Sequence, residues 1–230
     1  MRTIVVTGGT KGIGSAIAAH LAAQGDRVIA VARHPAPIPA GVTFVACDIT
    51  NAASVARVFT GIGRVDALVN AAGLAGPNPL SPDDPLWHAI LAANLTGPWH
   101  CCTAALAKMA PGGRIVNIAS TLGLRAVPDQ PAYVAAKHGL IGLTRSLALA
   151  VAARAITVNA VCPGWVDTDM ARARFTDLGI TAADAAAGVP AGRIATPDDV
   201  AGAVAFLLSP AAAHITGHAL PVDGGALASA

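Results

Sequence analysis

A short apolar strand followed at once by a glycine-rich loop and a helix opens the chain, and this order restricts the fold more than any other feature. The β-branched run Thr3–Val6 leads into Thr7–Gly14, and an alanine-rich helix extends to about Ala23. Glycines let a backbone approach a pyrophosphate, and a helix N-terminus favours an anion. The G-x-x-x-G-x-G spacing could also be a tight turn with good packing. Its position at the first strand–helix turn favours a phosphate site.

Apolar strands and helices continue to alternate along the chain. The runs that we expect to form the later strands are residues 28–32, 42–46, 67–70, 115–119, 156–161 and 218–222. Strands that alternate with helices predict a parallel, doubly wound sheet with helices on its faces. A chain of 230 residues is long enough for one such domain, and we expect residues 1–230 to form a single α/β domain.

Three segments interrupt the regular pattern. Pro35, Pro37 and Pro39 exclude a helix interior, so the crossover after the second strand is expected to be extended. A long helix from residue 85 to about 109 contains Gly97-Pro98, which predicts a kink. Residues 165–192 are rich in alanine and are expected to be irregular and to form a lid over a substrate.

Composition excludes several classes of function. Charged residues make up 12% and the net charge is +2, so neither a nucleic-acid nor a membrane partner is indicated. No apolar run approaches the roughly 18 residues of a membrane span, and a first strand at Thr3 leaves no room for a signal peptide. The mean hydropathy of +0.58 predicts apolar helix faces buried between subunits.

The acids and cysteines give no sign of a metal site. All 13 acids are aspartates, and the cysteines lack a C-x-x-C spacing. We expect buried thiols in a reducing compartment, the cytoplasm, rather than disulfides or zinc ligands. The four cysteines are Cys47, Cys101, Cys102 and Cys162.

The stretch from Ser120 to Lys137 carries the clearest sign of chemistry. Tyr133 is the only tyrosine, and Lys137 follows four residues later, on the same face of the expected helix. Ser120 ends an apolar strand, at the edge where open α/β sheets place their ligands. A chance Tyr-x-x-x-Lys pair is improbable, because the chain has only three lysines.

With these residues placed, the chain resembles the short-chain dehydrogenase/reductase family over essentially its whole length. The ordered motifs that carry the resemblance are Thr7-Gly8-x-x-x-Gly12-x-Gly14, Asp48, Asn70-Ala71-Ala72-Gly73, Asn94, Ser120, Tyr133-x-x-x-Lys137 and Pro163-Gly164. The resemblance implies a seven-stranded parallel Rossmann-type sheet, an NAD or NADP coenzyme, and a tetramer or dimer formed through the two long helices. We expect the homotetramer.

Two departures from the family pattern stand out. Ala71 occupies the place of the second asparagine in the usual Asn-Asn-Ala-Gly loop. The proline-rich link replaces the helix usual between the second and third strands, so one face of the sheet or the adenosine pocket is expected to be more exposed.

The resemblance implies the roles of individual residues. The catalytic set would be Asn94, Ser120, Tyr133 and Lys137. The cofactor-binding set would be Gly8, Thr10, Lys11, Gly12, Ile13, Gly14, Arg33, Asp48, Ile49, Asn70, Ala71, Ala72, Gly73, Tyr133, Lys137, Pro163, Gly164, Val166 and Thr168.

These residues suit hydride transfer between a nicotinamide and a carbonyl carbon. A free tyrosine is a poor base at neutral pH, with a pKa near 10. The Lys137 ammonium and the positive nicotinamide are expected to lower the pKa of Tyr133, which then exchanges the proton. Ser120 would stabilise charge on the carbonyl oxygen, and Asn94, by resemblance, holds a water of the proton relay.

The second strand predicts the coenzyme. It ends in Val31-Ala32-Arg33, without the acid that selects NAD by binding the ribose 2′-hydroxyl. Arg33 and Lys11 would converge on a 2′-phosphate, so we expect NADP(H). The alternative is that both are solvated surface cations.

We expect an NADP(H)-dependent oxidoreductase that acts on a ketone or a secondary alcohol of small size. An alternative is a reductase of 3-oxoacyl thioesters on an acyl carrier protein, although Arg125, Arg172 and Arg174 are the only nearby candidates for a basic patch. A remote alternative is a non-catalytic NADP-binding sensor, against which the complete catalytic set argues.

Overall fold

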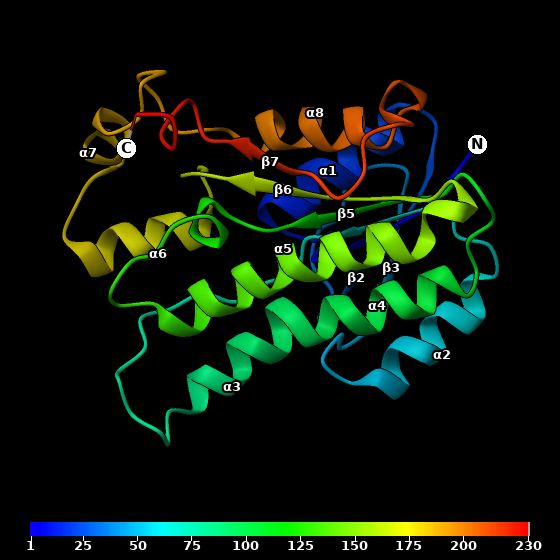
Figure 1. Ribbon diagram of the computed structural model, residues 1–230, viewed down its shortest axis with the longest axis horizontal. Helices are drawn as coiled ribbons and strands as arrows, with labels where there is room; N and C mark the ends of the chain where they lie inside the picture. The colour runs from blue at the N-terminus through cyan, green and yellow to red at the C-terminus, as the bar shows by residue number, and fades with distance from the viewer. Residues whose placement is uncertain (230) are drawn as a thin grey trace.

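The computed structural model describes residues 1–229 and shows a seven-stranded parallel sheet between two layers of helices (Figure 1). The strand order is β3-β2-β1-β4-β5-β6-β7. The strands are β1 (Thr3–Thr7), β2 (Arg27–Ala32), β3 (Val42–Ala46), β4 (Ala67–Asn70), β5 (Arg114–Ile118), β6 (Thr157–Pro163) and β7 (Ala219–Val222). This order confirms the predicted single doubly wound α/β domain.

Helices cover both faces of the sheet. The α-helices are α1 (Gly12–Ala23), α2 (Ala52–Ile62), α3 (Pro85–Leu91), α4 (Gly97–Leu106), α5 (Pro131–Val151), α6 (Asp169–Leu178), α7 (Ala182–Ala187) and α8 (Pro197–Leu207). In Figure 1, α1 and α8 lie together on one face, and α2, α4 and α5 lie on the other.

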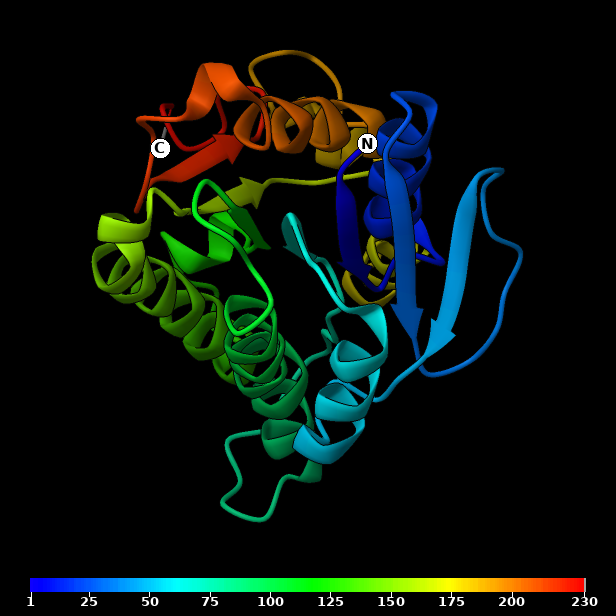
Figure 2. The same ribbon diagram turned by 90° about the vertical axis from the view of Figure 1, so that its right-hand side faces the viewer.

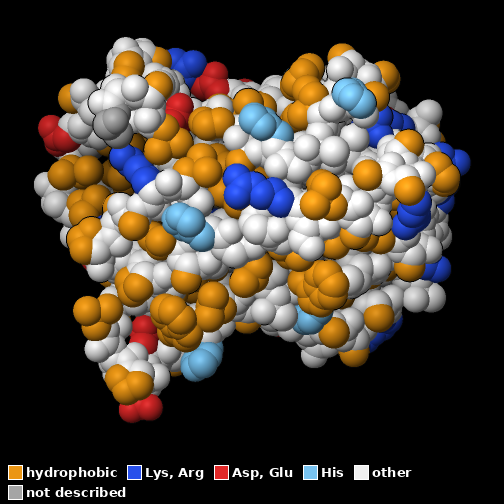
Figure 3. Space-filling view, in the orientation of Figure 1, with side chains coloured by type: hydrophobic (Ala, Val, Ile, Leu, Met, Phe, Trp, Pro, Cys, Tyr) orange, Lys and Arg blue, Asp and Glu red, His pale blue; other side chains and the backbone are white. Residues whose placement is uncertain are grey.

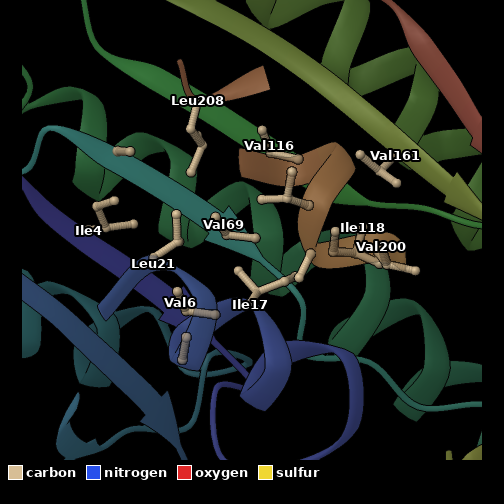
Figure 4. Packing of buried hydrophobic residues seen from close by; sticks show 14 of the residues in the cluster. Ile4, Val6, Ile17, Leu21, Val69, Val116, Ile118, Val161, Val200 and Leu208 are labelled. Atoms are coloured by element: carbon tan, nitrogen blue, oxygen red, sulfur yellow. The ribbon is translucent and has the colours of Figure 1, made fainter. Parts of the chain in front are cut away.

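The fully buried strands form a hydrophobic core with each helical layer. On the α1 and α8 side, Ile17 and Leu21 of α1 meet Val200 of α8 over the strand residues Val6 and Val69 (Figure 4). On the other side, Val5 and Ile115 belong to a core that includes residues of α2, α4 and α5. Because both faces are covered, strands such as β4 and β6 are buried at every residue, as expected for a parallel sheet.

The link between β2 and β3 is extended, as the three prolines predicted. Residues 33–41, all within the described part of the chain, contain no helix, and the link projects as a long loop beside the edge of the sheet (Figure 2). The sheet therefore ends in β3 without a crossover helix over residues 33–41.

The structure corrects two expectations about helices. The predicted long helix is divided into α3, a π-helical turn over Ala92–Thr96, and α4. The lid segment 165–192 is mostly helical, because threonines cap both of its helices: Thr168 begins α6, and Thr181 forms a capping box with Asp184 at α7.

The expected thiols are confirmed as free and buried at all four cysteines. None of the helices in residues 1–229 combines the length and apolar character that a membrane span requires.

Candidate active site

The glycine loop forms a narrow cradle at the carboxyl end of β1. Gly8 and Gly12 adopt positive φ angles of 68° and 50°, a conformation that favours glycine. A Cβ atom on Gly8 would lie 2.8 Å from the Cα of Ala72, and one on Gly14 would lie 2.2 Å from the Gly8 carbonyl oxygen. The side chain of Lys11 does not cap α1, so the first amides of the helix remain available to an anion.

The loop after β4 packs directly on this cradle. The Thr7 hydroxyl accepts hydrogen bonds from the amides of Ala71 and Ala72, each at 3.2 Å. Gly73 has almost no spare room, since a Cβ there would lie 2.8 Å from Asn94 Oδ1 and 3.9 Å from Lys137 Nζ. Gly73 therefore connects the glycine cradle with two predicted catalytic residues.

The structure places the side chain of Asn70 in the interior, away from the cleft. Its Nδ2 donates to Asn117 Oδ1 at 2.8 Å and lies 3.3 Å from Cys102 Sγ. Asn117 in turn donates to the hydroxyl of Thr144 on α5 at 2.9 Å. This buried chain joins β4, β5 and α5 through the Nδ2 of Asn70.

Asn94 is fully buried in the middle of the π-helical turn. Its Nδ2 donates to the carbonyls of Leu74 at 2.7 Å and Ile90 at 2.9 Å, and its Oδ1 accepts from the Leu74 amide at 3.4 Å. Such turns often mark functional sites. The side chain thus fixes the loop after β4 against the α3–α4 junction.

Tyr133 and Lys137 lie together on α5, facing the end of β5. Lys137 Nζ is 5.4 Å from the centre of the Tyr133 ring and donates to the Ile118 carbonyl at 2.8 Å. The Ser120 hydroxyl accepts from the Leu122 amide at 3.0 Å. The spacing of these residues in the sequence therefore does bring them to one place.

Burial shifts both ionisable groups away from their charged forms. It raises the pKa of Tyr133 to about 12, while the nearby Ser120 hydroxyl acts in the opposite direction. It lowers the pKa of Lys137 to about 8. In the coenzyme-free protein desolvation thus raises the pKa of Tyr133, and the lowering expected from Lys137 together with a positive nicotinamide stays a prediction for the complex.

The segment after β6 borders the glycine loop. Gly164 donates its amide to the Val222 carbonyl at 3.0 Å, and Val166 is buried. Thr168 lies against the glycine loop, since a Cβ on Gly12 would be 3.4 Å from Thr168 Cγ2. The segment from Pro163 to Thr168 thus reaches the cradle of β1.

The predicted coenzyme cations are exposed beside the end of β2. Lys11 and Arg33 form no ion pair with any residue in the range 1–229. Asp48 accepts hydrogen bonds from the amide and the hydroxyl of Thr50 at 3.0 and 2.8 Å. These bonds lower the pKa of Asp48, and the charge of Arg33 adds a smaller lowering. Ile49 is buried against Gly97.

The segment predicted to form a lid makes a contact that the sequence did not reveal. Arg174 on α6 forms an ion pair with Asp129, in the turn that enters α5, and its side chain is only 14% exposed. The backbone carbonyl of Asp129 accepts from the Asn78 amide at 2.9 Å. No pattern in the sequence pairs residues 45 positions apart, so this latch between α6 and the Tyr133 helix is visible only in the structure.

The geometry fits a dinucleotide. The cradle of Gly8, Gly12 and Gly14 would be filled by added Cβ atoms, and it opens at uncapped helix amides. At the same sheet edge, Tyr133 and Lys137 lie near Ser120.

Comparison with known proteins agrees with this arrangement. A family model described as enoyl-(acyl carrier protein) reductase matches residues 8–226. The chain is 40% identical to the 3-oxoacyl-(acyl-carrier-protein) reductase MabA of Mycobacterium tuberculosis, over 97% of this chain and 92% of that protein.

Solved structures give the same result. The ligand-free aldohexose dehydrogenase of Thermoplasma acidophilum superposes with a TM-score of 0.94 at 34% identity, covering 100% of this chain and 95% of that one. The actinorhodin polyketide ketoreductase with NADPH gives 0.90 at 36% identity, with coverage of 98% and 97%. A matching family model and relatives over nearly the whole length establish that this chain belongs to the short-chain dehydrogenase/reductase family.

Proposed function

We propose that this protein is an NADP(H)-dependent oxidoreductase that interconverts a ketone and a secondary alcohol. The observation that carries the proposal is the position of Tyr133, Lys137 and Ser120 at the sheet edge that also holds the glycine cradle. Relatives of the same family are named 3-oxoacyl reductases, and one superposed ketoreductase was solved with NADPH.

When bound, a nicotinamide coenzyme would supply or accept the hydride at the substrate carbon. Tyr133 gives its phenolic proton to the carbonyl oxygen during reduction and takes it back during oxidation. With a pKa raised to about 12, Tyr133 is protonated at neutral pH and is ready to act as the acid. The Ser120 oxygen accepts from the Leu122 amide, which leaves its O–H free to donate to the same carbonyl oxygen.

Lys137 has two tasks in this proposal. Its charged form stabilises the tyrosinate left after proton transfer, and its pKa of about 8 lets it exchange a proton near neutral pH. By resemblance it also binds the ribose hydroxyls. The Oδ1 and Nδ2 atoms of Asn94 both bond to the backbone of Leu74 or Ile90. These bonds position the loop after β4 for the relay water that the family pattern implies.

The coenzyme contacts follow the geometry of the cleft. The loop from Gly8 to Gly14, including Thr10 and Ile13, would hold the pyrophosphate. Lys11 and Arg33 would bind the 2′-phosphate. The adenine and nicotinamide ends would be bordered by Asp48 and Ile49, by the backbone from Asn70 to Gly73, and by Pro163, Gly164, Val166 and Thr168.

There are two candidates for the physiological substrate: a free ketone and a carrier-bound 3-oxoacyl thioester. The second is favoured by the names of the relatives. The family model carries the name of an enoyl reductase, which reduces a C=C bond. We favour a carbonyl because Ser120 and Tyr133 together would contact an oxygen that gains charge.

Two of the three arginines proposed for an acidic carrier are already neutralised. Arg172 pairs with Asp167 and Asp169, and Arg174 pairs with Asp129. Of these three arginines, only Arg125 forms no ion pair with an acid in residues 1–229. These residues therefore give little support to docking of a carrier, and we place the free ketone or alcohol first.

We further propose a homotetramer in a reducing compartment, the cytoplasm, with residues 165–192 as a substrate lid. Exposed apolar side chains support the tetramer: Trp99 is 45% exposed, Leu149 81% and Phe206 46%. Hydrophobic side chains also lie over α3 and α4 in Figure 3. Light scattering at micromolar concentration tests this, and a monomer would contradict it.

Replacing Tyr133 by Phe tests the catalytic proposal. The ring fills the same space but holds no proton, so kcat should fall by about 10²–10⁴-fold while coenzyme binding persists. The assay follows NADPH oxidation with a panel of ketones, 3-oxoacyl thioesters and enoyl thioesters. Retention of more than about a tenth of kcat would refute the role of Tyr133, and turnover of no carbonyl by the wild type would favour a binding protein instead.

A further inference from the structure

A cavity of about 180 Å³ lies at the amino-terminal edge of the sheet, opposite the edge that holds Ser120. It is bordered by the residues that begin β1, β4 and β5 and by the chain that follows α8. Three of its lining residues are arginines: Arg2, Arg64 and Arg114. Lys and Arg side chains gather along this edge in Figure 3, on the side where Figure 1 marks the N-terminus.

Two of these arginines are paired with acids. Arg2 binds Asp26 with a separation of 2.5 Å between Nη2 and Oδ2, and its Nη1 donates to the Leu208 carbonyl at 2.7 Å. Arg64 binds Asp66 at 2.6 Å, while the other oxygen of Asp66 accepts from the Thr3 amide at 2.8 Å. Both guanidinium groups are therefore fixed at the cavity by their acidic partners.

Arg114 is different because no acid in residues 1–229 pairs with it. Its Nη1 donates to the carbonyls of Gly112 at 2.6 Å and Gly113 at 3.0 Å, and more weakly to Ala155 at 3.4 Å. Its Nε is buried and has no hydrogen-bond partner. A buried donor on a cation without a partner is unusual and costly.

The electrostatics of the cavity are also unbalanced. Three arginines and two aspartates leave one positive charge. Burial, together with the nearby Arg2, lowers the pKa of Arg114. One additional negative charge would remove the imbalance and would accept a hydrogen bond from Arg114 Nη2, which donates to no group in residues 1–229.

We propose that this cavity binds a small oxyanion of the phosphate or sulfate type, held by Arg114 between Arg2 and Arg64. A guanidinium group offers donors in a planar fork that matches two oxygens of such an ion. The cavity is far larger than a single water needs. The proposal is independent of the oxidoreductase function, because none of the cavity residues belongs to the cofactor or catalytic set.

A purely structural role for Arg114 is the competing explanation. Its Nη1 bonds tie the Gly112–Gly113 turn to Ala155, and this accounts for one nitrogen. It does not account for the two further arginines at the same cavity. The experiment must therefore separate loss of anion binding from loss of stability.

The test measures binding of sodium sulfate and sodium phosphate to the full chain by calorimetry and by thermal melting, against sodium chloride at equal ionic strength. The variants are Arg114→Gln and Arg64→Gln. Because Arg64 is exposed, the variant Arg64→Gln should fold normally and keep the hydrogen bonds of Arg114. It therefore still tests anion binding if Arg114→Gln folds poorly. Arg57→Gln on α2 is the matched control, because Arg57 is exposed and lies outside the cavity.

We expect saturable binding to the wild type and to Arg57→Gln. Loss of a charge-assisted hydrogen bond should weaken binding by about tenfold or more in Arg114→Gln, with a smaller loss in Arg64→Gln and unchanged NADPH binding in both. Sulfate that stabilises all four proteins equally, or no saturable binding to the wild type, would overturn it, since sulfate stabilises proteins non-specifically.

Discussion

The buried lysine of the candidate active site should make the stability of the coenzyme-free protein depend on pH. Lys137 is 4% exposed, and burial lowers its pKa from 10.5 to about 8. Between these two values the unfolded chain binds more protons than the folded one, so the free energy of unfolding rises with pH. Below pH 8 the native state must carry the charged form at its full desolvation cost.

The size of this effect follows from the two pKa values. A shift from 10.5 to about 8 corresponds to a cost of about 3 kcal/mol at pH 7. The same relation leaves a cost of about 1.4 kcal/mol at pH 9.5. Relative to a Lys137→Met variant, which cannot ionise, the wild type should therefore gain about 2 kcal/mol between pH 7 and pH 9.5.

Urea unfolding of the coenzyme-free protein, at one protein concentration and several pH values, measures how the difference in unfolding free energy between wild type and Lys137→Met changes with pH. Other titrating groups act equally in both proteins and cancel. Lys108→Met is the matched control, because Lys108 is exposed at the end of α4, and it should show no such trend. A constant difference between wild type and Lys137→Met across this pH range would refute the idea that Lys137 is desolvated in the native state.

Three further predictions concern the cleft. Gly8→Ala should lose coenzyme binding, measured by fluorescence titration, because its Cβ would lie 2.8 Å from the backbone of Ala72. Arg33→Ala should lower the kcat/KM preference for NADPH by about tenfold or more, and Ala32→Asp should shift it toward NADH; an unchanged ratio would contradict the assigned pocket. Arg174→Ala should release the latch to α5 and raise KM more than it lowers kcat, whereas unchanged steady-state constants would exclude a role for the latch in substrate binding.

The features that could be predicted from the sequence depend on short-range patterns. The glycine loop is signalled by residues within one strand–helix turn, and Tyr133 and Lys137 by one turn of helix. The absence of a helix in residues 33–41 follows from proline geometry alone. Each of these signals rests on neighbouring residues, so tertiary packing was not needed to interpret it.

The features that were missed depend on contacts between distant segments. Nothing near Asn70 in the sequence reveals that its side chain turns toward Asn117 on the next strand. The ion pair of Arg174 with Asp129 joins residues far apart in the chain. The helices of the predicted lid segment are an exception, because the threonine and the aspartate of the Thr181 capping box are only three residues apart and could have been recognised.

The π-helical turn shows how the fold supports the chemistry. The Gly97 amide bonds to the Ala92 carbonyl five residues back, so the α-helical ladder is interrupted here. The side chain of Asn94 satisfies the Ile90 carbonyl and reaches across to Leu74. That reach brings its Oδ1 against Gly73, which also lies close to Lys137 Nζ. The irregular turn therefore places Asn94 between the loop after β4 and Lys137, the lysine of the predicted catalytic set.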